Sequence, residues 1–362
     1  MERADLTFVT TIGQGSMDKY SVELGRRLPV ARLVTDVYES RADVWGLPLL
    51  GPRSLRIAAR DAAFVAELRR LGQPVHLPNQ HLARYGRFLS RPWLITVHDT
   101  IRWFDLRGRH EPLIHPPNRR DRLLLGLDYA GIRRATAVIA ASHATRRDLV
   151  EHVGLEPGRV HVVHEAIDHD LYRPVSRRVV EGPYVLYVGT EHPRKNFGRV
   201  LEAFARLRRP GLRLVKAGGP GKGEWDFRTA TDRKLAGLGL GEEVVFTGRI
   251  PDEDLVALYS GALCLIFPSL YEGFGFPVLE AMACGCPVVT STASSLPEVA
   301  GDAALLVDPC ESAAIAAAAA RLVDDDALRR DVAERGRRHA AGFTWERCAR
   351  ETLRVYDRVL VG

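Results

Sequence analysis

Strand-like and helix-like runs alternate along the chain, and the alternation starts twice in 362 residues. In the first half we expect strands over 6–11, 93–98, 136–141 and 160–163, with helices over 18–28 and 144–152. In the second half we expect strands over 184–189, 212–217, 243–247, 263–267 and 287–290, with helices over 196–208, 229–238, 252–260 and 277–284. Such alternation favours parallel sheets covered by helices on both faces. The sequence therefore predicts an α/β protein with two sheets, joined within 166–183.

Length and composition fit a protein with two ordinary domains. A chain of 362 residues can bury two cores, and 46% hydrophobic with 27% charged residues is typical of soluble globular proteins. No apolar run approaches the roughly 18–20 residues that span a bilayer. The first residues lack the order of a signal peptide, so we expect a cytoplasmic protein.

The five cysteines, at 264, 284, 286, 310 and 348, form no CxxC pair. We expect buried, reduced thiols. A metal site at Cys284 and Cys286 is disfavoured, because no second pair of ligands accompanies them.

The net charge of +6 suits an anionic partner. Nucleic acid is not expected, since no zinc-finger spacing or RNA-recognition signature is present. The arginine-rich segment 102–134 mixes cations with aromatic and aliphatic residues. It could touch an anionic membrane surface. The alternative, a solvated helical face, is favoured because no clear amphipathic pattern emerges.

Residues 268–290 combine a glycine-rich loop with a short helix. An apolar run ends at Pro268, Pro277 suits the first helical position, and Gly285 suits the residue just after the helix. This order places free backbone N–H groups at a helix N-terminus, where an anion is expected. Two carboxylates nevertheless lie here, at Glu272 and Glu280.

A second loop, after the strand 184–188, carries two adjacent cations. Arg194 and Lys195 precede a helix, where positive charge opposes the helix dipole unless an anion binds. With the backbone near Gly275, Val278 and Leu279 they could hold a diphosphate without a metal. Lys216 to Pro220 is a weaker candidate loop of the same kind. The carboxylates are tolerable beside a diphosphate if they accept hydrogen bonds from sugar hydroxyls, Glu272 from a transferred sugar and Glu280 from a ribose.

Two features of the first half also point to a ligand. Gly13-Gln14-Gly15-Ser16 follows the first strand; it is either a tight turn or a place of close backbone approach to a ligand. His98 stands at the C-terminal end of a strand, where ligands bind in open α/β sheets. A structural, hydrogen-bonded histidine is the alternative.

The stretch Pro-Ser-x-x-Glu-Gly-Phe-Gly-Phe-Pro-x-Leu-Glu-Ala-Met-Ala-Cys-Gly-x-Pro-Val, with Glu272 and Glu280 eight positions apart, resembles the E-x7-E motif of retaining glycosyltransferases. The resemblance is to family 4 of the GT-B enzymes. It extends to further segments: Thr96–His98, Ala141–Thr145, Gly189–Asn196, Val245–Gly248, Leu296–Val299 and Phe343–Glu346.

This resemblance implies two Rossmann-like domains whose parallel sheets face a central cleft. We expect an acceptor domain over 1–170, a donor domain over 171–342 and a C-terminal helix, 343–362, that crosses back to the first domain. The implied catalytic residues are His98, Glu272, Arg194 and Lys195. The implied donor-binding residues are Gly13, Gly15, Ser16, Ile250, Gly273, Phe274, Gly275, Phe276, Val278, Leu279 and Glu280.

The implied reaction transfers a hexosyl unit, with retained configuration, from GDP-mannose or a UDP-sugar to a hydroxyl of a glycan, lipid-linked or small-molecule acceptor. No cofactor or metal is expected. Two departures from the family pattern are Thr190, where an arginine often stands, and Glu165-Ala166-Ile167-Asp168 in place of Asn-Gly-Val-Asp. Arg194 could substitute for the missing arginine. A sugar-nucleotide epimerase, a phosphorylase, and a non-catalytic nucleotide-sugar-binding protein remain alternatives.

Overall fold

The computed structural model describes residues 6–13, 15–37, 52–108, 113–221 and 227–361. The chain divides into two compact units. Unit 1 comprises Met1–Pro112, Pro116–Ala166 and Trp345–Gly362, and unit 2 comprises Leu113–His115 and Ile167–Thr344. The expected domain boundaries after 170 and 342 stay predictions.

Unit 1 is built on a six-stranded sheet in the order β2-β1-β3-β4-β5-β6, and its strand pairs are parallel. Its strands are β1 (Thr7–Thr11), β2 (Ala31–Thr35), β3 (Val75–Leu77), β4 (Trp93–Val97), β5 (Ala137–Ala140) and β6 (Val160–Val162). The strand order reverses at β1, whose neighbours are β2 and β3. The crevice beyond the carboxyl ends of strands at such a reversal is where open α/β sheets bind ligands.

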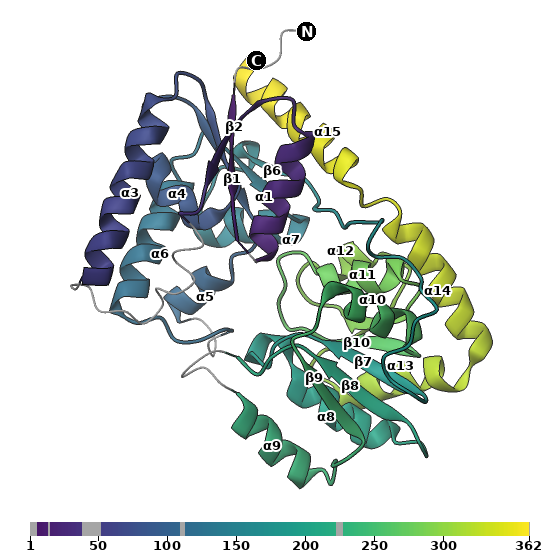
Figure 1. Cartoon of the computed structure of the whole chain (residues 1–362). Helices are drawn as coiled ribbons and strands as arrows, with labels where there is room; N and C mark the ends of the chain where they lie inside the picture. The colour runs from purple at the N-terminus through teal and green to yellow at the C-terminus, as the bar shows by residue number, and fades with distance from the viewer. Residues whose placement is uncertain (1–5, 14, 38–51, 109–112, 222–226, 362) are drawn as a thin grey trace. The chain divides into compact units, whose positions relative to one another are not determined.

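The helices of unit 1 lie on both sides of this sheet (Figure 1). They are α1 (Ser16–Arg27), α3 (Pro52–Arg70), α4 (Ala83–Gly86), α5 (Ile101–Arg107), α6 (Arg119–Ile132), α7 (His143–Asp148) and α15 (Trp345–Tyr356). Short 3-10 or π-helical turns are η1 (Gln80–Leu82), η2 (Leu149–Val153), η3 (Pro157–Arg159) and η6 (Asp357–Val361).

The last helix completes the core of unit 1. Apolar side chains of α15 recur at the helical period, and Trp345, Cys348 and Val355 pack with Phe8 of β1 and Leu24 of α1. An amphipathic helix is stabilised mainly by burying such a face. The helix α15 therefore belongs to the unit formed by the start of the chain.

Unit 2 contains a second parallel sheet, in the order β12-β11-β10-β7-β8-β9. Its strands are β7 (Tyr184–Val188), β8 (Arg213–Ala217), β9 (Val244–Gly248), β10 (Cys264–Phe267), β11 (Val288–Ser291) and β12 (Leu305–Val307). Here β7 lies between β8 and β10. The order reverses between β7 and β10, which marks the second ligand-binding crevice expected for such sheets.

Helices cover this sheet too, with α8 and α13 on one face and α10 and α11 on the other (Figure 1). The helices are α8 (Phe197–Leu207), α9 (Arg228–Gly237), α10 (Asp252–Gly261), α11 (Phe276–Ala283), α12 (Leu296–Ala300), α13 (Ser312–Asp324) and α14 (Asp326–Ala340), with the turn η4 (Pro193–Lys195) before α8. Asp325 caps α14 by accepting from the N–H groups of Ala327 and Leu328.

The α/β prediction with two sheets is confirmed, but several elements were missed, including β12 and α14 in unit 2. No element was predicted between 28 and 93, where β2, α3 and β3 lie. The strand β2 is an edge strand with exposed or half-buried side chains, so its sequence lacks a buried apolar run. Of the cysteines, which are free, four are buried as expected, whereas Cys310 is exposed. Among the described residues, no helix has the length and apolarity that crossing a bilayer requires.

Candidate active site

The loops after β7 and β10 meet at the reversal of strand order in unit 2. The first loop runs from Gly189 to Asn196 and the second from Pro268 to Gly275. The N–H of Leu270 donates to the carbonyl of Arg194 at 2.7 Å, which joins the two loops directly. The ends of two adjacent parallel strands thus present one continuous surface of loop residues.

Asn196 fixes the relative position of these loops. Its side-chain amide donates to the carbonyls of Pro268 at 2.9 Å and Pro309 at 2.7 Å. Its φ of 60° is in the left-handed region, which asparagine tolerates better than most residues. The side chain is buried, so a substitution would leave two carbonyls without this donor.

Three predicted site residues form one buried ion cluster on these loops. Arg194 Nη1 lies 2.7 Å from Glu272 Oε2, and Lys195 Nζ lies 2.7 Å from Glu272 Oε1. Arg194 also donates to the carbonyl of Tyr271 at 3.2 Å. The ammonium of Lys195 lies 4.9 Å from the centroid of the Phe267 ring. The structure therefore brings Arg194, Lys195 and Glu272 together, with one carboxylate shared by two cations.

The shared carboxylate is ionised. Burial alone would raise the pKa of Glu272, but the charges of Arg194 and Lys195 outweigh burial and lower it to about 2. Burial, together with the like charge of Arg194, lowers the pKa of Lys195 to about 8, although Glu272 acts in the opposite direction. Because Arg194 alone can neutralise Glu272, Lys195 is the cation in excess.

The glycine loop leads directly into α11. Gly275 precedes the helix with φ 121°, and a Cβ at this position would lie 2.8 Å from Leu296 Cδ2, so only glycine fits without strain. Pro277 is the second helical residue, one later than predicted, because α11 begins at Phe276. The N–H of Val278, predicted to face an anion, donates to the carbonyl of Gly275 at 3.0 Å.

Ser295, from the loop after β11, anchors the backbone of the glycine loop. Ser295 Oγ donates to the carbonyls of Glu272 at 3.0 Å and Phe274 at 2.6 Å. Phe274 is buried, while Phe276 packs against it with ring centroids 5.4 Å apart. Gly273 lies between these anchored residues, so the backbone of the loop is supported along its length.

Glu280 lies in α11, with its carboxylate near two tyrosines. Tyr259 donates to Glu280 Oε2 at 2.9 Å. Burial raises the pKa of Tyr172, and the neighbouring Glu280 raises it further. Glu280 is half-buried, whereas Leu279 is fully buried. The expected roles of Glu280 and Leu279 in donor binding stay predictions.

The weaker candidate loop, after β8, has a different organisation from the one predicted. Lys216 is fully buried; its Nζ lies 3.0 Å from Glu191 Oε1 and donates to the carbonyls of Gly218 and Gly219 at 2.7 and 3.0 Å. Its ammonium is therefore used to hold its own loop. The N–H of Gly218 donates to the carbonyl of Gly248, close to half-buried Ile250.

In unit 1, the glycine loop after β1 is held by Asp18. The N–H of Gly15 donates to Asp18 Oδ2 at 3.2 Å, and Ser16 is the first residue of α1. A Cβ on Gly13 would lie 2.3 Å from the same oxygen. Gln14 lies outside the described residues. The tight packing against Asp18 explains both glycines, and their donor-binding role stays a prediction.

His98 is held by protein groups on both ring nitrogens. Nδ1 bonds to Glu165 in a short contact, and Nε2 lies 2.8 Å from the carbonyl of Pro78. Two acceptors favour the imidazolium form, which alone donates from both ring nitrogens. Burial opposes this charge, but Glu165 outweighs it and raises the pKa of His98. A ligand contact through either nitrogen would have to replace one of these bonds, which fits the structural alternative.

The arginine-rich segment forms parts of α5 and α6, and residues 109–112 lie outside the described residues. Arg102 is buried and bonds to Asp105 at 2.7 Å. Arg107 and Arg133 lie over the ring of Trp103, at 4.4 and 5.1 Å from its centroid. These three arginines are engaged inside unit 1. Contact of the segment with a membrane stays a prediction.

Three contacts were not predicted: Asn196 as an anchor, Glu191 as the partner of Lys216, and Glu165 as the partner of His98. An asparagine directly before a helix could have indicated the left-handed position of Asn196. Glu165 was noted only as a departure from a family pattern, and 67 residues separate it from His98. Nothing in the sequence indicates such a pairing.

Comparison with known families agrees with this geometry. Residues 168–339 match Glycosyl transferases group 1, and residues 25–171 match Glycosyltransferase Family 4. The chain is also 30% identical over 374 residues to O-antigen chain mannosyltransferase B of Escherichia coli, covering 93% of this chain and 94% of that protein. The chain belongs to the group 1, family 4 glycosyltransferases.

Other similar proteins share the family or the fold. MMP alpha-(1->4)-mannosyltransferase of Mycolicibacterium hassiacum is 33% identical over 238 residues, which cover 63% of this glycosyltransferase and 55% of that protein. Sucrose-phosphate synthase of Thermosynechococcus elongatus has a TM-score of 0.77 at 23% identity, with 99% and 100% of the two chains covered. HepE of Anabaena, solved with UDP-glucose, has a TM-score of 0.77 at 18% identity, with 98% and 99% covered. The two units thus have the GT-B fold.

Proposed function

We propose that this glycosyltransferase moves a hexosyl unit from a nucleoside-diphosphate sugar to an acceptor hydroxyl, with retained configuration and without a metal. A mannosyl unit from GDP-mannose is the first choice, because two of the similar proteins are named mannosyltransferases. UDP-sugars come second, since HepE was solved with UDP-glucose.

The observation that carries the proposal is the cluster of Arg194, Lys195 and Glu272 at the strand-order reversal of unit 2. A diphosphate needs positive charge, and the cluster contains one cation more than its carboxylate neutralises. A guanidinium has five N–H donors and an ammonium three, so the cluster holds more donors than the two that bond to Glu272. The same residues can therefore hold Glu272 and stabilise a leaving diphosphate.

In the proposed reaction the bond between the sugar C1 and the diphosphate oxygen breaks, and a bond from C1 to the acceptor oxygen forms on the same face. The departing phosphate oxygen takes the acceptor proton. Arg194 and Lys195 stabilise the charge that develops on the diphosphate. Glu272 accepts hydrogen bonds from the sugar and orients it, while Glu280 does so for the ribose.

No divalent cation is needed in this scheme, because the charges of Arg194 and Lys195 can neutralise phosphate charge as a metal would. We expect full activity after dialysis against a chelator. A loss of activity that added Mg²⁺ or Mn²⁺ restores would contradict the metal-free mechanism while leaving the transfer itself intact.

The direct test is a thermal-shift comparison of GDP-mannose, UDP-glucose and their nucleoside diphosphates, since a ligand that binds the native state raises its apparent stability. Product formation with an acceptor panel would follow, and NMR of the anomeric proton would report the configuration. An inverted product would contradict the mechanism. Epimer or sugar phosphate formed without an acceptor hydroxyl would contradict the transfer reaction.

A further inference from the structure

A basic pocket of about 470 Å³ lies in unit 1, and none of its lining residues belongs to the loops described above. It is bounded by the edge strand β6, by α7 and by α15 with the turn η6, and we call it the edge pocket. Its lining includes Arg146, His161, Arg354 and Arg358. A volume of this size lies in the range of small-molecule sites.

The C-terminal helix contributes a line of charged residues to the edge pocket. Arg347, Glu351, Arg354 and Arg358 follow one another at intervals of four, three and four residues, so they share one face of the helix. The other side of the helix carries the core residues Trp345, Cys348 and Tyr356, and Val355 lies between the two faces, in the core and in the pocket wall. Burial of that face therefore fixes the direction in which the charged line points.

The positive charge in the edge pocket is only partly neutralised. Arg347 pairs with Glu351 at 2.8 Å. Arg146 donates to the carbonyls of Val160 and Pro157, at 3.1 and 3.2 Å, which orients its guanidinium without cancelling its charge. Within the described part of the chain, no carboxylate pairs with Arg354 or Arg358. Four arginines and one glutamate line the pocket, which leaves three positive charges in excess.

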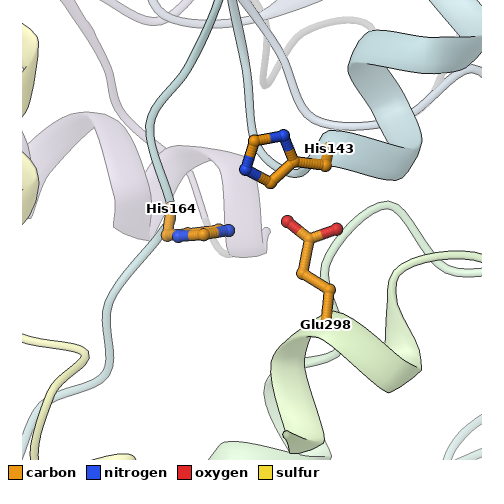
Figure 2. A group of neighbouring side chains, drawn as sticks. All are labelled: His143, His164 and Glu298. Atoms are coloured by element: carbon orange, nitrogen blue, oxygen red, sulfur yellow. The ribbon is translucent and has the colours of Figure 1, made fainter.

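Histidines add hydrogen-bonding groups to this charge. His161 stands on β6 and is partly buried; burial, and then the charges of Arg358 and Arg146, lower its pKa. Both guanidiniums therefore act on the same ring. His143 and His164 lie beside each other, with ring centroids 5.8 Å apart (Figure 2). Glu298, also drawn there, belongs to unit 2.

A second cavity lined by arginines differs from the edge pocket in its charge balance. In unit 2 a cavity of about 660 Å³ is also lined by arginines. There, however, Arg208 pairs with Glu243 at 3.0 Å, and Arg209 pairs with Asp324 at 2.7 Å. That cavity has little charge to offer an anion, whereas the edge pocket has an excess.

We propose that the edge pocket binds a phosphate group of a small molecule or lipid headgroup, through Arg354, Arg358 and Arg146. Guanidiniums match phosphate oxygens with paired N–H donors, and the imidazole of His161 offers a further N–H donor. An excess of three positive charges suits a phosphate monoester or a diphosphate better than a single carboxylate. The site includes neither Arg194 nor Lys195, which belong to unit 2, and it does not depend on the donor proposal.

The test measures binding of inorganic diphosphate to the full chain by calorimetry. We expect two sites in the wild type. Arg354→Gln with Arg358→Gln should weaken the edge-pocket site by about tenfold or more, because two charge-assisted contacts are lost, while donor-site binding persists. Lys195→Met should weaken diphosphate binding at the donor site and leave the edge-pocket site unchanged. A failure of the donor proposal would thus remove the Lys195-sensitive site and leave the edge-pocket site unchanged.

The matched control is Arg69→Gln with Arg70→Gln, two exposed arginines at the end of α3 in the same unit. It removes the same net charge and should leave both sites unchanged. Arg354→Lys with Arg358→Lys keeps the charge but loses the paired donors, so its affinity should fall between wild type and glutamine variant. Equal loss in the control, or wild-type affinity in the glutamine variant, would overturn the assignment. Thermal melts of each variant check that it folds.

Vesicles distinguish a lipid from a soluble source. Phosphatidylcholine vesicles with and without phosphatidic acid would be tested for co-sedimentation with each variant. Binding that requires phosphatidic acid and Arg354/Arg358, and that diphosphate displaces, would identify a lipid headgroup. Diphosphate binding without vesicle binding would identify a soluble ligand. Two results together would contradict the proposal. The glutamine variant would still bind vesicles, and the wild type would show no diphosphate binding at the edge pocket.

Discussion

Each unit of this glycosyltransferase contains a buried ion cluster near the end of a central strand, and the two clusters differ in their charge balance. In unit 2, Glu272 is shared by Arg194 and Lys195, and these side chains are 9%, 15% and 12% exposed. In unit 1, Glu165 pairs with His98 alone, and the two are 2% and 9% exposed. One cluster has a cation in excess, and the other is balanced.

This difference indicates different tasks. A buried charge without a partner is costly, so a surplus cation is tolerable only where an anion can join it or where it can lose its proton. Lys195, with its lowered pKa, meets both conditions. The imidazolium of His98 has its charge cancelled and both N–H groups bonded, so the pair joins β4 to the segment after β6 without offering charge to a ligand.

We call Arg194, Lys195 and Glu272 the surplus cluster and the pair of His98 and Glu165 the balanced cluster. The largest expected effect comes from Glu272→Gln, which removes the carboxylate from the surplus cluster. We expect transfer to fall by about 100-fold or more, because the sugar loses its orienting acceptor. Two buried cations would be left without their partner, so the free energy of unfolding should fall by about 3 kcal/mol. Transfer assays and urea unfolding measure the two effects.

A nucleotide sharpens this test. Because diphosphate charge would replace the lost carboxylate, GDP or UDP should stabilise Glu272→Gln against heat by more degrees than it stabilises wild type. Wild-type transfer rates in the variant would refute the role of Glu272. Equal thermal shifts would refute the idea that the surplus charge awaits an anion.

Glu165→Gln tests the balanced cluster and should act on stability. The pKa of His98 is raised in the folded protein, so the pair stabilises the fold below about pH 6.5 and loses this contribution as pH rises through the raised pKa. We expect the variant to lose about 3 kcal/mol at pH 6, with little change in nucleotide affinity. Urea unfolding at pH 6 and at higher pH, for both proteins, would reveal whether the wild-type pH dependence disappears.

These clusters also show where reasoning from sequence succeeds. Arg194, Lys195 and Glu272 were selected together because each follows a strand, and the carboxyl ends of β7 and β10 meet at one edge of the sheet. Strong apolar runs located those strands to within one residue. The position of α11 followed from Pro277 and Gly285, whose backbone preferences bracket a short helix.

The features that were not predicted depend on contacts between segments far apart in the sequence, or on elements without a clear apolar pattern. His98 and Glu165 are 67 residues apart, and their pairing depends on the order of β4, β5 and β6. The element α3 was missed because its arginines obscure the apolar stripe, and β2 because edge strands need no buried face. The edge pocket requires α15, from the end of the chain, beside β6.

Lys195→Met reduces the surplus cluster to a balanced pair like that of unit 1. Since Arg194 still neutralises Glu272, the fold should be little affected. Affinity for the nucleoside diphosphate should fall by about tenfold, the value of one charge-assisted contact, with turnover falling as well. Calorimetry gives the affinity. Lys234→Met is the control, because Lys234 pairs with Glu202 at the surface of the same unit. Unchanged affinity in Lys195→Met would exclude Lys195 from the diphosphate site.

The smallest expected effect is a pH dependence of nucleotide affinity, which we expect from the surplus cluster and not from the balanced one. With a pKa of about 8, Lys195 is mostly charged at pH 7 and mostly neutral at pH 9 in the free protein. A bound diphosphate favours the charged ammonium, so binding above pH 8 must take up a proton, and affinity should fall several-fold between pH 7 and 9. Calorimetry in buffers of different ionisation enthalpy would detect that proton uptake directly. In Lys195→Met both the uptake and the decline should vanish, whereas a decline that persists there would belong to another group.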